Sequence, residues 1–207
     1  MIIKADIIAS RLESSDTDED PLVITPQPDI EVLRKSGSGS VDLRLGTWIS
    51  TMRNTTITSL NVLKPGTCVP NENHLTKLHY VPFGTDFILH PNAFVLGAAL
   101  EWIRLPKNLA GYVIGKSKWG RRGLIIATAT GVHPGFTGCL TLEITNLGEV
   151  PICIRPGMSI CQLFLHKVDS NTEDTDPSSL SGNRKPVLGT ITPDHFALRL
   201  STPIEEL

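Results

Sequence analysis

The chain has 207 residues, enough for one domain with a substantial core. Hydrophobic residues make up 40% and charged residues 19%, and the formal net charge of -2 gives no overall attraction to nucleic acid polymers or anionic membranes. No apolar run approaches the roughly 20 residues that span a bilayer. The N-terminal segment lacks a signal-peptide layout, because Lys4 and Asp6 interrupt its short apolar stretch. We therefore expect a cytoplasmic protein with no membrane partner and no nucleic acid polymer as partner.

The cysteines show no spacing that is typical of a metal site. They are Cys68, Cys139, Cys153 and Cys161, and none belongs to a C-x-x-C pair. We expect buried, reduced thiols and no zinc.

Apolar residues near the N-terminus recur at the spacing of one helix face. They are Ile3, Ile7, Ile8 and Leu12. This periodicity predicts a short amphipathic helix over residues 3–13. The acidic, serine-rich stretch that follows is typical of a loop.

From residue 22 onward the pattern changes to short apolar or alternating runs between Pro, Gly and Asn. The chain contains 17 Gly and 15 Pro, so turn signals are frequent. Many short strands at regular spacing predict an all-β barrel or jelly roll. The runs are VDLRLG, FILHP, FVLGAAL, GYVIG, LIIATATG, CLTLEITN, VPICIRPG and SICQLFLH.

The segment 168–187 is polar and poor in large apolar residues, which predicts a loop or arm rather than core. Beyond it, Phe196, Leu198 and Leu200 return to alternation and predict a terminal strand.

A basic, glycine-containing stretch, GKSKWGRRGL, occupies residues 115–124. It places cations and the hydroxyl of Ser117 on backbone that glycine makes permissive, which is what triphosphate binding requires. A solvated basic turn would have the same composition, so the residues alone leave both interpretations open. The cations are Lys116, Lys118, Arg121 and Arg122.

The strand CLTLEITN carries the carboxylate of Glu143 on a polar face. Alternation puts Leu140, Leu142 and Ile144 on one side of the strand, and Glu143 on the other between two threonines. A carboxylate held there could accept a proton from water. An ordinary solvent-facing glutamate fits the same pattern, so the strand by itself decides nothing.

Five linked segments resemble dCTP deaminases of the dUTPase/dCTP deaminase family, in the order and spacing of that family. They are SGSGSVDLRLG (36–46), LHPNAFVLGAALEWIRLP (89–106), GKSKWGRRGL (115–124), HPGFTGCLTLEITN (133–146) and PICIRPGMSICQL (151–163). The resemblance covers roughly residues 1–166. It implies a distorted β-barrel or jelly roll of the dUTPase type in residues 1–166, with residues 167–207 as a polar loop and C-terminal arm.

The resemblance also implies a homotrimer with active sites at subunit interfaces, and Mg²⁺ carried by the substrate triphosphate without zinc. Glu143 matches the catalytic glutamate, which takes a proton from the water that attacks C4 of cytosine. Ser117 and Arg121 match the residues that hold the water and the base. Lys116 and Lys118 stand at triphosphate-contact positions, where the family commonly has arginine and serine. Ala129 matches a small residue beside the cytosine.

Two features depart from the family pattern. His133 stands where the family has an aspartate near the sugar 3′-hydroxyl, and this aspartate helps position water in dUTPases. A histidine can still bond to a hydroxyl, but it is a poorer substitute for a permanent carboxylate. The arm also lacks the usual tyrosine, lysine and glutamine, although Arg184 and Lys185 could reach phosphates.

These residues predict an enzyme that deaminates dCTP to dUTP and ammonia. A dUTP or dCTP pyrophosphohydrolase, or a bifunctional enzyme, is the first alternative, and His133 argues against it. A non-catalytic nucleotide-binding regulatory protein of the same fold is the second alternative, which the altered arm and His133 motivate and the presence of Glu143 opposes.

Overall fold

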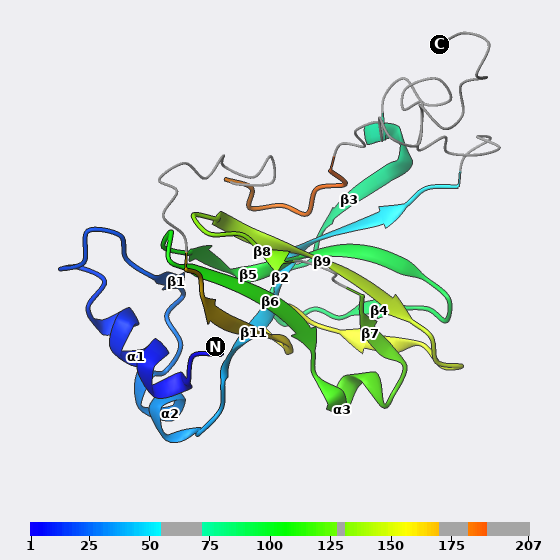
Figure 1. Ribbon diagram of the computed structural model, residues 1–207. Coiled ribbons are helices and arrows are strands. Elements are labelled where there is room, and N and C mark those ends of the chain that lie inside the picture. Colours follow the sequence, from blue (N-terminus) through cyan, green and yellow to red (C-terminus); the bar gives the residue numbers. More distant parts are fainter. Residues whose placement is uncertain (55–71, 128–130, 170–181, 190–207) are drawn as a thin grey trace, which may run out of the picture. The chain divides into compact units, whose positions relative to one another are not determined.

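The computed structural model describes residues 1–54, 72–127, 131–169 and 182–189 (Figure 1). The chain divides into two compact units. The first comprises Met1–Thr51 with Leu78–Val187, and the second comprises Met52–Lys77 with Leu188–Leu207. In the second unit, the 3-10 helix η1 (Glu72–Leu75) leads into β3 (Thr76–Tyr80), and the N–H of Arg53 donates to the carbonyl of Leu75 at 2.8 Å. The terminal strand expected at Phe196–Leu200 lies outside the described residues.

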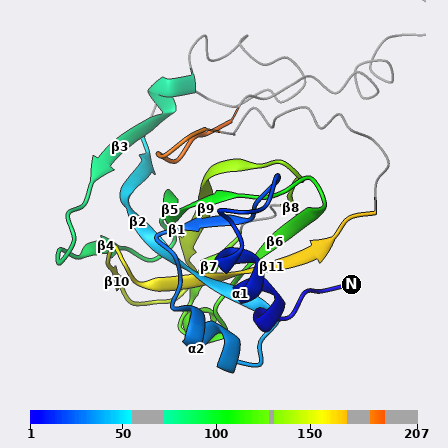
Figure 2. The same ribbon diagram turned by 90° about the vertical axis from the view of Figure 1, so that its left-hand side faces the viewer.

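The first unit is built mainly of strands that curl into half a barrel around its core (Figure 2). The sheet runs in the order β7-β9-β5-β2-β11-β6-β8, with β1 paired to β5 and β3 to β2, and β10 pairs with β4 separately. The predicted all-β architecture is confirmed. The strands are β1 Val23–Thr25, β2 Ser40–Met52, β4 Phe87–Leu89, β5 Phe94–Arg104, β6 Leu109–Gly115, β7 Leu124–Ile126, β8 Gly131–Val132, β9 Thr137–Asn146, β10 Ile152–Ile154 and β11 Ser159–Lys167.

The core lies inside this curl and follows the alternation of the strands. On β9, Leu140, Leu142 and Ile144 are buried, whereas Thr141 and Glu143 are only half-buried. The period-two pattern of this strand therefore predicted its inner and outer faces correctly. Core positions on β11 and β2 alternate less regularly, because both strands contribute to pairings that change register.

The predicted N-terminal helix is present as α1 (Ala5–Glu13). Its buried face includes Ile8 and Leu12, as expected, but Ile7 is 47% exposed. Ile3 is buried in front of the helix, where its N–H donates to the carbonyl of Leu165 at 2.9 Å. Ala5 and Ala9 fill the remaining buried positions of the helix.

A second helix, α2 (Ile30–Lys35), was not predicted. Asp29 caps it, since its carboxylate accepts the N–H of Val32 at 3.0 Å. The helix packs beside α1 (Figures 1 and 2), and Arg34 forms an ion pair with Glu13 across the two helices. An aspartate before a short apolar run was the signal that sequence reasoning missed.

Irregular register marks the middle of the sheet in two adjacent places. Leu45 of β2 pairs with Ala99 of β5, and Ile49 pairs with Gly97, so β2 advances by four residues where β5 advances by two. Ala98 of β5 pairs with Thr141 of β9, and Trp102 pairs with Cys139, so β5 advances by four residues where β9 advances by two. Extra residues of this kind bend a strand away from its partner. The two bulges therefore meet at Ala98 and Ala99 of β5.

The thiols only partly match the prediction. Cys139 and Cys161 are buried, and burial raises the pKa of the Cys161 thiol to about 12. Cys153 is exposed on β10, so the expectation of a buried thiol was wrong there, because its alternate position on the strand faces outward. Cys68 lies outside the described residues. Within the described ranges, no helix is long and apolar enough to cross a membrane.

Candidate active site

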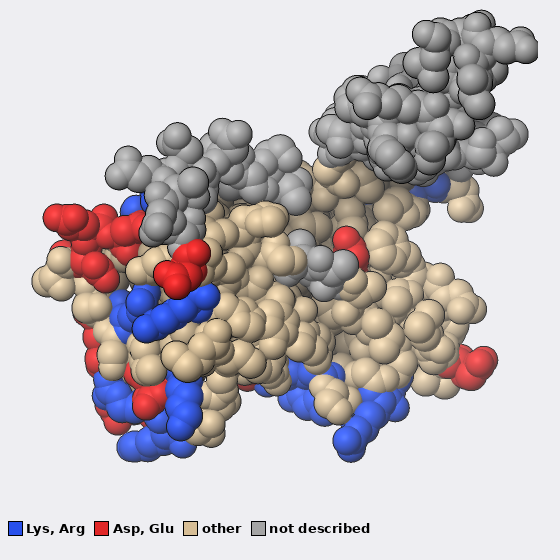
Figure 3. Space-filling view, viewed as in Figure 1, with Lys and Arg blue, Asp and Glu red and all other residues tan. Residues whose placement is uncertain are grey.

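The basic stretch folds into a tight turn between β6 and β7. It contains α3 (Ser117–Gly120), a short helix where sequence reasoning expected only a turn. Two bonds to β11 anchor it: the N–H of Lys116 donates to the carbonyl of Ile160 at 3.1 Å, and Nε1 of Trp119 donates to the carbonyl of Ser159 at 2.8 Å. Trp119 is half-buried, as expected for a packing aromatic. Figure 3 shows Lys and Arg gathered where Figure 1 places α3.

Lys116 does not stand alone in this turn. Its Nζ pairs with Oδ2 of Asp42 on β2 at 2.5 Å, and the hydroxyl of Ser159 donates to the same oxygen at 3.2 Å. Asp42 therefore faces the predicted phosphate site, although sequence reasoning did not select it. Its place in the VDLRLG segment was the available signal. A bound triphosphate would share Lys116 with this carboxylate.

The other groups of the turn are exposed. Ser117, Lys118 and Arg121 all lie at the surface. Lys118 rests over the ring of Trp119 at 4.8 Å from the centroid, and Nη1 of Arg122 donates to the carbonyl of Lys118 at 2.7 Å. The turn thus presents cations and one hydroxyl to solvent, with its backbone held firmly against the barrel.

Glu143 lies in the middle of β9, on the predicted polar face. It is half-buried and faces Leu96 across the pairing with β5. On its other side the N–H of Ala127 donates to the carbonyl of Glu143 at 2.8 Å. The neighbouring hydroxyl of Thr145 donates to the carbonyl of Ala93 at 3.0 Å. The backbone of Glu143 is therefore held between β5 and β7.

The α3 turn reaches the sheet at the far end of the same strand. Leu124 pairs with Asn146, and the N–H of Leu147 donates to the carbonyl of Gly123 at 2.8 Å. Asn146 is fully buried and fixes this end, since its amide donates to the carbonyls of Leu89 and Val150. Within one chain, α3 therefore adjoins the Asn146 end of β9, and Glu143 lies nearer the middle of the strand.

The remaining predicted substrate contacts lie elsewhere. His133 is exposed in the turn after β8, where its carbonyl accepts the N–H of Phe136 at 3.2 Å. Ala129 lies outside the described residues. Residues 182–187 run along the beginning of β9: the N–H of Cys139 donates to the carbonyl of Asn183 at 2.8 Å. Farther along, the N–H of Val187 donates to Oγ1 of Thr141 at 3.2 Å.

The two cations of the arm, Arg184 and Lys185, each lie over a tryptophan ring. The guanidinium of Arg184 lies 5.0 Å from the ring centroid of Trp102, and Nζ of Lys185 lies 4.3 Å from that of Trp48. This segment meets β9 near Thr141, whereas α3 meets it near Asn146, and at ~3.4 Å per residue these points are roughly 17 Å apart. Within one chain, the arm cations and the α3 cations therefore occupy different ends of β9.

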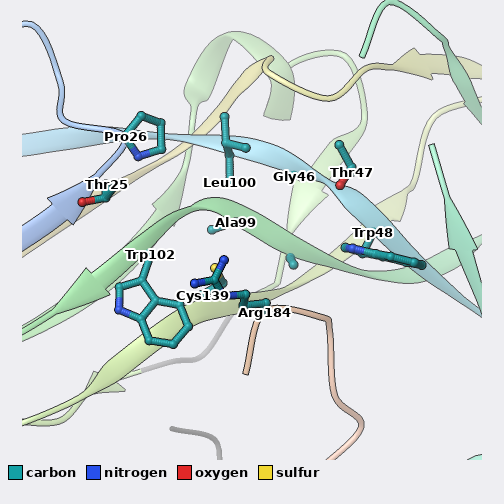
Figure 4. A pocket seen from close by; sticks show the side chains of 11 residues that line it. Thr25, Pro26, Gly46, Thr47, Trp48, Ala99, Leu100, Trp102, Cys139 and Arg184 are labelled. Carbon is teal, nitrogen blue, oxygen red and sulfur yellow. The ribbon is translucent and has the colours of Figure 1, made fainter. Parts of the chain in front are cut away.

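Two hollows flank the central strand β2. One of about 490 Å³ opens at the paired bulges and includes Trp48, Trp102 and Arg184 (Figure 4). The other, of about 310 Å³, lies beside α2 and includes Asp42 and Gln162. The linings of these two hollows do not include Glu143.

An ion pair between half-buried Arg44 of β2 and buried Glu101 of β5 lies in the bulged region. Glu101 is 1% exposed, and its carboxylate accepts both the N–H of Arg44 at 2.8 Å and Nη1 of Arg44 at 3.0 Å. Burial raises the pKa of Glu101, and the bonds from Arg44 oppose that rise. Sequence reasoning did not select this pair, because nothing local to either residue indicates the other.

The chain is similar to known proteins of one family. A dCTP deaminase-like family model matches residues 7–168. A protein of Mycobacterium sp. (strain KMS) named "dCTP deaminase, dUMP-forming" is 39% identical over 183 residues, covering 88% of this chain and 86% of the relative. A protein of the same name from Mycobacterium tuberculosis (strain H37Rv) is 39% identical over 146 residues, covering 70% and 74%.

A solved structure gives the same fold. It is 2'-deoxycytidine 5'-triphosphate deaminase from Agrobacterium tumefaciens, with a TM-score of 0.56 and 23% identity. The match covers 79% of this chain and 46% of that chain, and at this identity it supports the fold alone. The family model spans most of the chain and includes β9 and the α3 turn. This chain is therefore a member of the dCTP deaminase-like family.

Proposed function

We propose that this chain is an enzyme that deaminates dCTP and releases ammonia. The observation that carries the proposal is the position of Glu143, a half-buried carboxylate on the polar face of a rigid β9 in a chain of this family. The α3 turn also retains Ser117 and Arg121. The names of the mycobacterial relatives support dCTP as substrate.

Glu143 acts as general base and general acid in this proposal. Its carboxylate takes a proton from a water molecule whose oxygen bonds to C4 of cytosine. The same proton then passes to the exocyclic nitrogen, the C4–N bond breaks, and ammonia leaves. The oxygen on C4 becomes the carbonyl of uracil, and its remaining proton moves to N3. Ser117 and Arg121 hold the water and the base, and Ala129 limits the space beside the ring.

The triphosphate is held by cations, with Mg²⁺ carried on its oxygens. Lys116 and Lys118 supply charge in the α3 turn, and Arg184 and Lys185 supply it from the arm. Among the described residues, no group of three or more His, Cys, Asp or Glu side chains could hold a metal ion. Mg²⁺ is often held by substrate phosphates with few protein ligands. Bound Mg²⁺ would neutralise part of the phosphate charge.

A homotrimer completes the site in this proposal. The α3 turn, Glu143 and the arm cations lie at separate points along β9 of one chain. Closed cyclic symmetry would bring the turn of one subunit to the β9 strand of its neighbour.

The final product distinguishes two candidate functions. Sequence reasoning predicts dUTP, because His133 replaces the carboxylate that positions water for phosphate release. The relatives are named dUMP-forming, which favours a bifunctional enzyme that also releases pyrophosphate. His133 is exposed and free of the barrel core, so it can reach a sugar hydroxyl in either case.

One assay tests the function and the product together. The protein is incubated with dCTP and Mg²⁺, ammonia is quantified, and the nucleotides are separated by chromatography. We expect ammonia, with dUTP as product if His133 disables phosphate release and dUMP if it does not. A protein that binds dCTP without producing ammonia would instead be a non-catalytic nucleotide-binding protein.

A matched pair of variants tests the catalytic role. Glu143→Gln keeps the shape of the side chain but removes the base, so turnover should fall at least ~10²-fold while dCTP binding persists. Glu149→Gln, at an exposed position after the same strand, is the control and should retain wild-type turnover. Near wild-type turnover by Glu143→Gln would contradict the mechanism.

A further inference from the structure

The two side chains that the proposed mechanism takes from the α3 turn lie at the surface. Ser117 and Arg121 are both exposed, so burial in the core does not fix them. The turn is closed by its own backbone instead: the N–H of Arg121 donates to the carbonyl of Ser117 at 3.0 Å, and the N–H of Arg122 donates to the carbonyl of Trp119 at 2.9 Å. The two groups therefore move with the turn, and their position depends on how the turn is attached to the barrel.

The turn is attached to β11 at two points. At its start, the N–H of Lys116 donates to the carbonyl of Ile160 at 3.1 Å. Within the turn, the half-buried indole of Trp119 packs against the core, and its Nε1 donates to the carbonyl of Ser159 at 2.8 Å. Trp119 stands two residues from each of the two exposed groups of the mechanism. Its bond is therefore the attachment that lies between them.

The first attachment does not depend on the second. Lys116 is held by its own backbone bond and by the ion pair of its Nζ with Asp42. Loss of the indole bond would release the part of the turn that carries Ser117 and Arg121, whereas Lys116 would keep both of its contacts. The indole N–H is thus placed to control the catalytic part of the turn separately from its first phosphate-binding cation.

The ring of Trp119 and its N–H can be separated by substitution. The ring packs against the core and lies beneath Nζ of Lys118, which is 4.8 Å from the ring centroid. Phenylalanine keeps an aromatic face for both contacts but has no N–H to donate to Ser159. A change at this position can therefore remove the bond to β11 and leave an aromatic side chain in place.

We propose that Trp119 is a positioning residue of the deamination site, whose indole N–H holds the α3 turn where Ser117 and Arg121 can act. The inference rests on the proposed function and deepens it, because Trp119 acts through these two groups and does not touch dCTP. Positioned groups lose much of their effect when they shift by a fraction of a bond length or more. The indole bond therefore supports turnover more than it supports binding of the triphosphate.

The test compares turnover with affinity in Trp119→Phe. We expect kcat to fall at least ~10-fold, because small misplacements of reacting groups slow a reaction strongly. Affinity for dCTP, measured by calorimetry on the Glu143→Gln background, should change by less than about threefold. Tyr112→Phe is the matched control: it removes one polar hydrogen from a half-buried aromatic side chain on β6, the strand that leads into the turn. It should retain wild-type kcat.

Two further measurements exclude a general loss of stability. Benzothienylalanine in place of Trp119 keeps the bicyclic shape and replaces the N–H with sulfur, so it should lower kcat as Trp119→Phe does. In the Ser117→Ala background, Trp119→Phe should cause a smaller loss of turnover than in the wild type, because one of the groups that it positions is already absent. An equal loss in both backgrounds would make Trp119 a structural residue and overturn the proposal. Thermal unfolding checks that each variant is folded.

The outcomes distinguish this inference from the proposed function. A wild-type protein that releases no ammonia from dCTP would overturn both the deamination and the positioning role. A wild-type protein that deaminates dCTP, with unchanged kcat in Trp119→Phe or in the benzothienylalanine variant, would overturn the positioning role alone. A fall in dCTP affinity as large as the fall in kcat would also overturn it, since the indole would then support phosphate binding.

Discussion

The structure gives Lys116 an ion-pair partner that sequence reasoning did not predict. Sequence reasoning assigned it to the triphosphate, and the structure pairs it with Asp42. This pairing orients the ammonium group and also lowers the positive potential of the turn. In the proposed site, removing Lys116 would cost one phosphate contact and leave the carboxylate of Asp42 without its ion-pair partner.

We predict that Lys116→Ala weakens dCTP binding roughly ten- to a hundredfold, since a charged hydrogen bond contributes about 1.5–3 kcal/mol. Affinity for deoxycytidine, which carries no phosphate, should change little. Asp42→Asn should have the opposite effect and tighten dCTP binding. Calorimetry on the Glu143→Gln background measures each affinity without turnover. Equal dCTP affinity in Lys116→Ala and its parent would show that the turn is merely solvated.

Glu101 provides a prediction about pH. Burial raises the pKa of its carboxyl above the ordinary 4.5, so the folded protein holds this proton more tightly than the unfolded chain. The contribution of Glu101 to the free energy of unfolding is therefore greatest below pH ~4.5 and declines as the pH rises through the folded-state pKa.

Glu101→Gln removes this titration. The stability of the wild type relative to Glu101→Gln should fall as the pH rises above ~4.5, measured by urea unfolding at several pH values. Parallel stability profiles for the two proteins would contradict the raised pKa.

At the scale of elements, the α3 turn depends on one glycine. Gly123 has a φ of +88°, and a Cβ there would lie 2.5 Å from the backbone nitrogen of Gly148. That neighbour cannot yield easily, because its N–H donates to the buried side chain of Asn146 at 2.9 Å. Gly120, in the same turn, has room for a methyl group, since a Cβ there would lie 4.0 Å from a side-chain carbon of Ile125.

We predict that Gly123→Ala destabilises the protein by about 1–3 kcal/mol and weakens dCTP binding, because the turn must shift. Gly120→Ala should change stability by less than about 1 kcal/mol, since alanine suits a helix better than glycine. Thermal unfolding and calorimetry measure both effects. If the two variants behave alike, the close approach of Gly123 and Gly148 does not hold the turn.

At the scale of the whole molecule, exposed apolar side chains point to an assembly. Leu147 and Val150 are 64% and 66% exposed, and Ile88 and Phe94 lie exposed on the adjoining strands. Such clusters mark protein contacts when they are contiguous. Asn146 bonds to Leu89 and Val150 and so keeps these segments together. This surface adjoins the α3 turn, which suits a site completed by a neighbouring subunit.

Mixing two inactive variants tests the proposed trimer. Glu143→Gln and Arg121→Ala each disable one half of a shared site, so neither variant alone should deaminate dCTP. If every site combines Glu143 of one subunit with Arg121 of the next, refolding an equal mixture should restore about one quarter of wild-type activity, because each mixed ring contains one intact site. No recovery would place both residues in one chain. Light scattering should report three times the 22.5 kDa chain mass.

The amino-acid sequence by itself determined the features that depend on local pattern. Alternation in β9 assigned Glu143 to the polar face, and helical spacing located α1, because both periods are properties of a few consecutive residues. The density of strands and turns predicted the fold class. Residues 115–124 were identified as a basic turn for the same reason, and the linked segments led to the family.

Only the tertiary structure decided which distant groups meet. The partner of Lys116 is Asp42, and Arg184 stacks on Trp102, yet each pair is far apart in the chain. Ile7 shares the spacing of the buried residues but lies outside the core, because packing against the barrel selects the helix face. The bulges at β2 and β5 arise from strand register, which depends on both partners at once. Local periodicity determines on which face of a helix or strand a residue lies, and long-range packing determines which residues it contacts.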